Sequence, residues 1–177
     1  MASRSLAIRT YLRLAHPGVK CHPSVRFGRG VSICAFDGGR IEIGAGSMIR
    51  DRAVVEAHGG ILKIGECTLI GRGSVVICTQ AITIGPGSLI AEYVTIRDHD
   101  HVHGGAAGLD AQGLSSAPID IGHDVWLAAK VTVTRGVTIA PRCVVGANSV
   151  VTRSLADRGV YVGAPARRLG PRSGDAG

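Results

Sequence analysis

A short run of alternating acidic residues and histidines is the densest group of chemically capable side chains: Asp98, His99, Asp100, His101 and His103. A histidine that titrates near neutral pH can take the proton of a hydroxyl as that hydroxyl attacks an acyl carbonyl, and a carboxylate on its other ring nitrogen fixes the tautomer. If the leaving group is a thiol, such a base, an oxyanion donor and correct positioning suffice without a covalent acyl-enzyme. In an extended chain the histidines would share one face and the aspartates the other, which also allows a metal site. The alternative without chemistry is a solvated, charged loop.

A repeat of six residues organises the chain around this cluster, and it is clearest over residues 119–155. Counting in sixes from Ile121 meets only aliphatic residues, and counting in sixes from Val125 meets small or apolar ones. A sustained period of six fits neither a helix nor an exposed strand, but it fits a solenoid of very short strands joined by polar bends. The same count, with two or three extra residues at some corners, runs through residues 25–156 and predicts about six coils.

The six-residue pattern lapses between Ile96 and Ile121 and then resumes in register. We expect a protruding loop over 97–118 that carries the acidic and histidine cluster and forms one wall of a pocket, because segments that leave a rigid scaffold often hold functional groups. The predicted divisions of the chain are an N-terminal helical cap over 1–20, a β-helix over 21–156 that includes this loop, and a C-terminal tail over 157–177. We expect residues 170–177 to be disordered, because they are small and polar.

Residues 4–15 predict a short amphipathic helix that ends before Pro17. The helical period would bring four side chains near one face: Leu6, Ala7, Tyr11 and Leu14. We expect the helix to cap the first coil, because an open solenoid end exposes an unpaired strand edge. Docking on an anionic membrane surface is the alternative.

Composition narrows the class of protein. The 26 glycines and the 3% of aromatic residues argue against an ordinary β-sandwich and suit a narrow solenoid filled by aliphatic side chains. The net charge of +7 suggests an anionic partner such as nucleic acid, membrane or a phosphorylated cofactor, or simply promotes solubility. The 5 cysteines have no CxxC spacing, which indicates thiols in a reducing compartment. Without a signal-peptide pattern or a long apolar span, we expect a cytoplasmic protein.

The run IGHDVWLAAKVTVTRGVTIAPRCVVGANSVVTRSL, followed by GVYVGAPARRL, resembles the last coils and tail of the hexapeptide-repeat acyltransferases, especially the galactoside and maltose types of sugar O-acetyltransferase. The resemblance implies an all-β, single-stranded left-handed parallel β-helix that works as a homotrimer. It implies acetyl-CoA as co-substrate, no required metal, and direct transfer to a hydroxyl of a sugar or cell-envelope glycan. Nucleic acid and integral membrane association are not implied.

The resemblance also implies roles for single residues. IGPGSLIAEYVTIRDHDH aligns without gaps with the coil that leads into the catalytic histidine of the family, which places His101 as the general base. His99 is the first alternative and His103 the second, with Asp98 or Asp100 as the orienting carboxylate. The implied coenzyme A positions are Ala129, Ala147, Thr152, Arg153 and Arg167, with Arg168 beside them. Trp126 would lie near the acyl site or anchor a subunit interface.

This chain departs from the galactoside-type pattern at a position that bears on the acceptor. The galactoside type carries an Asn in the coil before the catalytic one, where this chain reads VICTQ and offers Thr79 or Gln80. We therefore expect an acceptor other than a simple galactoside or maltose. An amino nucleophile and another acyl group stay open. Two other readings are a γ-class carbonic anhydrase, although only His123 stands where that family has a histidine pair, and a non-catalytic scaffold.

Overall fold

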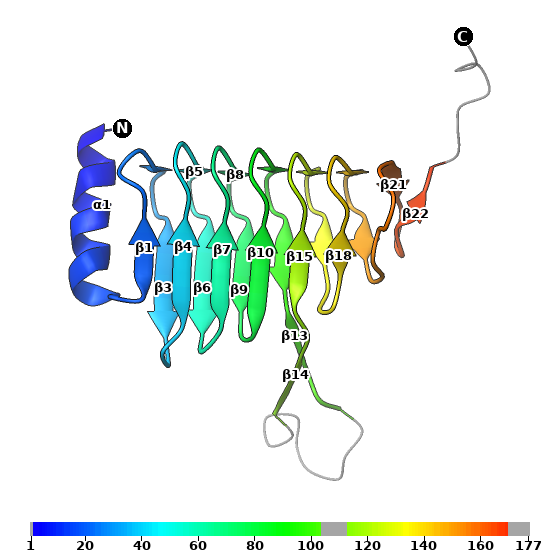
Figure 1. The fold of residues 1–177 in the computed structure, drawn as a ribbon, viewed down its shortest axis with the longest axis horizontal. Helices are drawn as coiled ribbons and strands as arrows, with labels where there is room; N and C mark the ends of the chain where they lie inside the picture. Colours follow the sequence, from blue (N-terminus) through cyan, green and yellow to red (C-terminus); the bar gives the residue numbers. More distant parts are fainter. Residues whose placement is uncertain (1, 104–112, 170–177) are drawn as a thin grey trace.

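The computed structural model describes residues 2–103 and 113–169, which form a long solenoid of parallel strands with a helix at its N-terminal end (Figure 1). The chain passes through three sheets in turn, and each strand pairs with its counterparts in the neighbouring coils. Two of the sheets contain six strands each among these residues. The predicted parallel β-solenoid of about six coils is therefore confirmed. Its left-handed winding stays an implication of the resemblance.

We name the three parallel sheets A, B and C in the order in which the chain visits them. Sheet A contains β1 (Val19–Cys21), β4 (Arg40–Ile43), β7 (Ile61–Ile64), β10 (Ala81–Ile84), β15 (Ile119–Ile121) and β18 (Thr138–Ile139). Sheet B contains β2 (Arg26–Phe27), β5 (Met48–Ile49), β8 (Leu69–Ile70), β11 (Leu89–Ile90), β16 (Trp126–Leu127), β19 (Val144–Val145), β21 (Val160–Val162) and β22 (Arg167–Arg168). Sheet C contains β3 (Ser32–Phe36), β6 (Val54–His58), β9 (Val75–Cys78), β12 (Thr95–Arg97), β17 (Thr132–Val133) and β20 (Val150–Val151).

The turns between sheets line up along the solenoid as edges. The C–A edge consists of the turns between a sheet C strand and the next sheet A strand, and the B–C edge of those between sheets B and C. In the C-terminal coils Asp120 pairs with Thr138, eighteen residues further on, whereas Ile41 pairs with Leu62, twenty-one residues further on. The extra residues of the early coils lie at the C–A edge, which confirms that the interruptions of the repeat are corner insertions.

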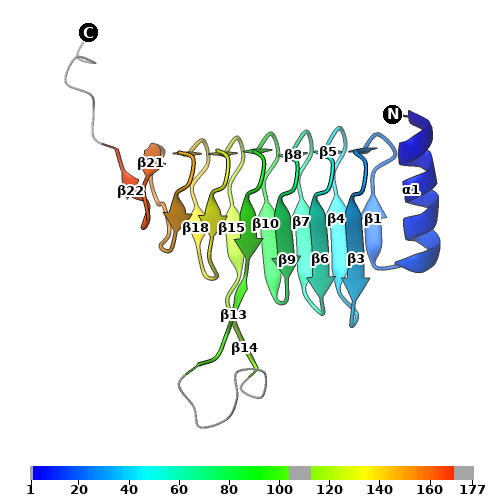
Figure 2. The same ribbon diagram turned by 180° about the vertical axis from the view of Figure 1, so that it is seen from behind.

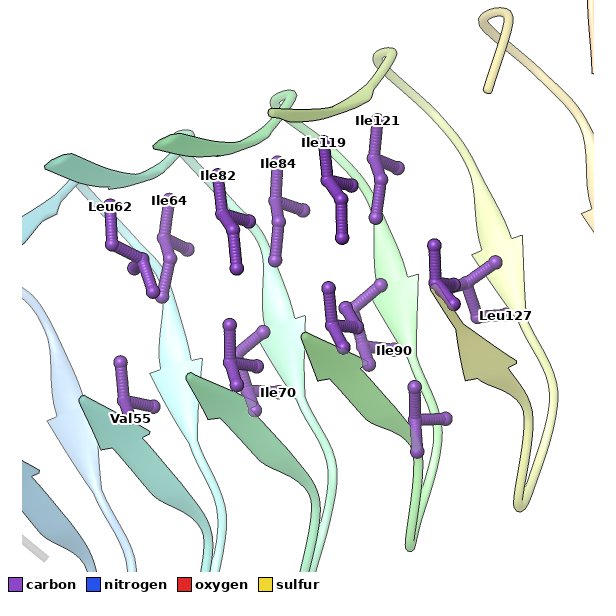
Figure 3. Close-up of a cluster of buried hydrophobic side chains, with 14 of the residues drawn as sticks. Val55, Leu62, Ile64, Ile70, Ile82, Ile84, Ile90, Ile119, Ile121 and Leu127 are labelled. Atoms are coloured by element: carbon purple, nitrogen blue, oxygen red, sulfur yellow. The ribbon is translucent and has the colours of Figure 1, made fainter. Parts of the chain in front are cut away.

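The solenoid interior is filled by the two rows of residues that the count of six predicts. The aliphatic row is at most 1% exposed: Ile121, Leu127, Val133, Ile139, Val145 and Val151. In the other row Ser149 is also buried, and its hydroxyl accepts the N–H of Gly163 at 3.0 Å. Figure 3 shows isoleucines of β10 and β11 pointing into the same interior. Each fully buried aliphatic side chain stabilises the fold by about 1.5–3 kcal/mol, so repetition of one small motif builds the whole core.

The chain leaves the solenoid after β12 and returns at β15. β13 (His99–His101) and β14 (Leu114–Ser116) form a two-stranded antiparallel ribbon that projects from the C–A edge (Figures 1 and 2). The predicted loop over 97–118 thus contains two paired strands at its base, while its residues 104–112 lie outside the described chain.

The helix α1 (Ala2–Ala15) covers the first coil. Leu12 is buried, and the backbone N–H of Phe27 donates to the hydroxyl of Ser5 at 3.1 Å. Leu6, Tyr11 and Leu14 are exposed, so the face that packs on the solenoid differs from the predicted apolar face. Within the described residues, no helix is both long and apolar enough to cross a membrane.

The C-terminal segment continues sheet B. β21 pairs in parallel with β19, and β22 turns back to pair with β21 in the antiparallel sense. Part of the expected tail over 157–177 is therefore ordered strand structure, and residues 170–177 lie outside the described chain.

Candidate active site

Asp98 is a buried carboxylate on the C–A edge, directly after β12. It accepts hydrogen bonds from the backbone N–H groups of Thr79, Gln80 and Ala81 in the preceding coil at 2.8, 2.8 and 2.9 Å. The hydroxyl of Thr79 donates another bond at 3.0 Å. A charge removed from water is costly unless such donors replace its hydration. The turn at residues 79–81 therefore forms a cradle for one carboxylate.

The cradle sets the protonation states of two buried groups. Burial favours a raised pKa for Asp98, but hydrogen bonds from Thr79, Gln80 and His99 outweigh it and lower the pKa of this carboxyl. The thiol of Cys78 lies 3.5 Å from the same carboxylate. Burial, reinforced by the negative charge of Asp98 and this hydrogen bond, raises the pKa of Cys78 to about 12. At neutral pH Asp98 is therefore ionised and Cys78 is a thiol.

His99 is held by this carboxylate. Its Nδ1 lies 3.1 Å from Oδ1 of Asp98, and its side chain is 11% exposed. An ionised carboxylate can only accept hydrogen bonds, so Nδ1 carries the proton. In the neutral ring Nε2 then holds the free lone pair. This is the arrangement in which an imidazole acts as a general base at Nε2.

The ribbon adds a hydroxyl beside this pair. Ser116 stands opposite His99 in the β13–β14 pairing, and its Oγ lies 2.8 Å from Oγ1 of Thr79. Sequence reasoning did not identify Ser116, because the residue is distant in the chain and is brought close only by the return of the ribbon. Thr79 and Gln80, which the sequence offered as acceptor-side residues, donate their backbone N–H groups to Asp98, and Thr79 also donates its hydroxyl.

The other members of the acidic and histidine cluster are more exposed to solvent than Asp98 and His99. Asp100 is exposed and lies 3.1 Å from Nε of Arg135, so its carboxylate pairs with a guanidinium. His101 is exposed on β13 opposite Leu114, and His103 is exposed beyond that strand. Among the described residues, His99 is the cluster's histidine that contacts a carboxylate.

The residues implied for coenzyme A fall on different parts of one chain. Ala129 and Ala147 occupy equivalent turns of the B–C edge, where the N–H of Asn148 donates to the carbonyl of Ala129 at 3.0 Å. Thr152 and Arg153 are exposed just after β20, on the C–A edge that also carries His99. Arg167 is exposed on β22. The small residues leave backbone accessible for an extended ligand, and the arginines can meet phosphate oxygens. The set fits a phosphorylated ligand chemically, although one protomer does not gather it at one place.

Trp126 lies on the outer face of sheet B. It is 48% exposed and is flanked in register by Leu89 and Val144. With Arg50, Arg72 and Tyr93 it lines a hollow of about 540 Å³. This position is on a different side of the protomer from the C–A edge, so Trp126 can reach a site beside His99 only across an interface between chains.

Metal ligation was the alternative use of the histidines. Over residues 2–103 and 113–169, no group of three or more His, Cys, Asp or Glu side chains is arranged to hold a metal ion. His123 contacts the carboxylate of Asp124, with 3.0 Å between Nδ1 and Oδ2.

Residues 118–153 match the bacterial transferase hexapeptide family, described as six repeats. A probable acetyltransferase of Mycobacterium tuberculosis is 36% identical over 157 residues, which cover 88% of this chain and 52% of that protein. The galactoside O-acetyltransferase of Escherichia coli is 34% identical over 113 residues, which cover 63% of this chain and 54% of the relative. The chain thus spans about half the length of these curated relatives.

Among solved structures, the hexapeptide-repeat acetyltransferase of Vibrio cholerae in complex with acetyl-CoA superposes with a TM-score of 0.61 and 25% identity. The match covers 95% of this chain and 83% of that one. The fold and the matched repeats define a hexapeptide-repeat solenoid, and the resemblance to the hexapeptide-repeat acyltransferases is confirmed.

Proposed function

We propose that this protein is an acyltransferase that moves an acetyl group from acetyl-CoA to a hydroxyl of a sugar or cell-envelope glycan. The observation that carries the proposal is the pair formed by the buried, ionised Asp98 and the imidazole of His99 on the C–A edge of a hexapeptide-repeat solenoid. Relatives named as acetyltransferases support the reaction class, and one of them is named for a galactoside acceptor.

His99 is the proposed catalytic base, in preference to His101. As the acceptor oxygen bonds to the acyl carbon, Nε2 of His99 takes up the hydroxyl proton, while Asp98 stabilises the resulting imidazolium at Nδ1. Acetyl-CoA, when bound, supplies a thioester whose carbon–sulfur bond breaks in the transfer. The imidazolium then returns its proton to the leaving sulfur, so His99 ends each turnover neutral.

Asp98 is a positioning residue in this scheme. It fixes the tautomer and the ring orientation of His99 without touching the acceptor. The arginines at 153 and 167 would hold the phosphates of coenzyme A. Because the implied ligand positions lie on two edges of a protomer, a homotrimer in which edges of neighbouring chains meet is part of the proposal.

Titration of acetyl-CoA into the protein by calorimetry, followed by thiol release with a panel of glycosides, tests the reaction class. We expect binding of acetyl-CoA and acceptor-dependent thiol release that is unchanged by chelator. Failure to bind acetyl-CoA would refute the proposal in favour of a scaffold. Stoichiometric zinc with chelator-sensitive carbon dioxide hydration would instead favour the carbonic anhydrase. Sedimentation velocity would separately test the trimer.

A further inference from the structure

The helix α1 lies across the N-terminal end of the solenoid and forms the outermost layer there (Figures 1 and 2). The side that faces the first coil holds Leu12, which is 2% exposed, and Ser5. The opposite side carries apolar residues that the core does not use: Leu6 and Tyr11 are each 60% exposed, and Leu14 is 82% exposed. A helix that only capped the coil would need one apolar side, so the second is available to a partner.

The helical period gathers the exposed apolar residues into one strip. Ala7, Tyr11 and Leu14 follow one another at intervals of four and three residues, so they share a face of α1, and Leu6 lies at the border of that face. We call these four residues the outer strip. Arg13 stands seven positions after Leu6 and therefore lies beside it on the helix. The outer strip is thus bordered by a cation.

A cationic hollow of about 300 Å³ adjoins the outer strip, between α1 and β1. Its lining includes Arg9, Arg13 and Lys20, alongside Leu12. Arg9 is anchored there, because its Nη1 donates to the carbonyl of Val25 at 3.1 Å. Among the side chains that the structure describes, none of the three cations pairs with a carboxylate. Their charges are therefore available to an anion from outside the chain.

The net charge of the protein is concentrated at this same end. Residues 1–36 contain 6 arginines and lysines and no aspartate or glutamate, so they carry +6 of the net charge of +7. The remaining 14 arginines and lysines are nearly balanced by the 13 acidic residues. Residues 1–36 comprise α1 and the first coil, which ends with β3. An anionic surface is therefore attracted to the α1 end of the solenoid.

An apolar strip beside unpaired cations matches the boundary of an anionic lipid bilayer. Leucine side chains can enter the acyl region while arginine and lysine side chains reach back to lipid phosphates, and a tyrosine suits the level between them. Two other partners fit less well. A second copy of the chain would bring two segments of charge +6 together, and a nucleic acid would engage the cations but leave the leucines in water.

We propose that α1 docks on the surface of an anionic membrane, with the outer strip between the lipid headgroups and Arg9, Arg13 and Lys20 in contact with lipid phosphates. The helix keeps its packing on the first coil through Leu12, so it lies in the plane of the membrane surface and does not cross the bilayer. This docking does not depend on the proposed acyltransferase function, and it holds the end of the solenoid against the membrane.

Co-sedimentation of the full chain with lipid vesicles tests the docking. At low salt, we expect the partition coefficient on phosphatidylcholine vesicles that contain about 30% phosphatidylglycerol to exceed that on pure phosphatidylcholine at least about tenfold. Arg13→Gln and Lys20→Gln should each lower the coefficient on the anionic vesicles about fivefold. Arg158→Gln is the matched control, because it removes an exposed cation at the opposite end of the solenoid, and it should change the coefficient less than about twofold.

The apolar contact is tested separately. Leu14→Ser and Leu6→Ser should each lower the partition coefficient on the anionic vesicles at least about fivefold, because each removes an apolar side chain from the lipid. Leu169→Ser is the matched control, since Leu169 is 46% exposed near the C-terminal end of the solenoid, and it should change the coefficient less than about twofold. If Leu14→Ser unfolds early in a thermal scan, Leu6→Ser decides.

Several results would overturn the docking. Equal partition on both kinds of vesicle, or no binding to either, would refute it. A loss in Arg158→Gln as large as that in Arg13→Gln would show attraction by overall charge without a defined face. Unchanged binding in the folded leucine variants would refute contact of the outer strip with lipid.

The other occupants of this face predict different results. Self-association that Leu14→Ser abolishes, without vesicle binding, would assign the outer strip to a second copy of the chain. Tighter binding to duplex DNA than to anionic vesicles, unaffected by Leu14→Ser, would assign the cations to nucleic acid. Release from vesicles by inorganic phosphate but not by chloride at equal ionic strength would make the hollow a site for free phosphate.

Discussion

Nδ1 of His99 lies 3.1 Å from the carboxylate of Asp98, although the two residues are neighbours in the chain. Side chains of adjacent residues in a strand point to opposite faces, so a regular strand would separate them. Asp98 instead lies between β12 and β13, where the chain turns away from the solenoid. This break in the strand lets the carboxylate enter the cradle at residues 79–81 while the half-buried imidazole stays beside it.

The role of this pair is tested first by removing the imidazole. Under the proposed function, His99→Ala should lower turnover at least about a hundredfold, because it removes the general base. His101→Ala is the matched control, since it removes an exposed imidazole two residues away on the same strand. Its turnover should stay within about threefold of the wild type. Thiol-release kinetics under saturating acetyl-CoA measure both. The opposite ranking of the two variants would assign the base to His101, as the sequence resemblance implies.

The second prediction concerns acid stability. The pKa of Asp98 is lower in the folded protein than its ordinary value, which is about 3.9 in an unfolded chain. Near that pH the unfolded chain binds more protons, so this carboxylate stabilises the fold above about pH 4 and the contribution is lost as the pH falls through the folded pKa. Urea unfolding at a series of pH values from neutrality to about 3 should show this loss of stability.

Asp98→Asn provides the comparison for this measurement. At neutral pH we expect it to destabilise the fold by about 2–3 kcal/mol, because an NH2 group replaces one carboxylate oxygen and faces N–H donors that need an acceptor. It should also flatten the dependence of stability on pH below about 5. An Asn variant with wild-type acid sensitivity would show that other carboxyls dominate. In active protein, Asp98→Asn should alter the acidic limb of the rate profile, which a purely structural residue would leave in place.

Much of the scaffold follows from the sequence because its core is local and repetitive. The residues counted in sixes from Ile121 are buried as predicted, since each strand contributes inward-facing residues at a fixed spacing. The insertions at the C–A edge were also visible as breaks in this count. The packing face of α1 was predicted wrongly, because Leu12 and Ser5 meet the first coil while Leu6 and Leu14 face outward. In so short a helix, an amphipathic pattern does not determine which face of the helix packs against the first coil.

The site was predictable only in part. The acidic and histidine cluster is evident from composition, but which histidine meets a carboxylate depends on where the strand breaks. The cradle of Asp98 consists mainly of backbone N–H groups at residues 79–81, which have no sequence signature. Ser116 is brought beside Thr79 only by the return of the ribbon. Contacts between distant residues of this kind cannot be read from one sequence.

The third prediction concerns the base of the ribbon. Nε of Arg135 lies 3.1 Å from a carboxylate oxygen of Asp100, and both side chains are largely exposed, at 41% and 61%. An exposed ion pair contributes little, so Arg135→Ala should change the free energy of unfolding by less than about 1 kcal/mol. Urea denaturation at low and high salt measures this. A loss above that value, or one insensitive to salt, would mean that the pair holds the ribbon on the solenoid.

The last prediction concerns the cysteines. The pKa of Cys78 is raised to about 12 by burial, by the charge of Asp98 and by the hydrogen bond to that carboxylate, so the thiol stays protonated at pH 8. Cys67 is exposed at a turn, whereas Cys78 and Cys143 are buried. Because the thiolate is the reactive form, iodoacetamide at pH 8 should alkylate Cys67 readily and leave Cys78 unmodified until the protein unfolds. Peptide mass spectrometry before and after addition of denaturant measures the order. Asp98→Asn removes the negative charge and should make Cys78 more reactive, while early labelling of Cys78 in the folded wild type would contradict the closed cradle around Asp98.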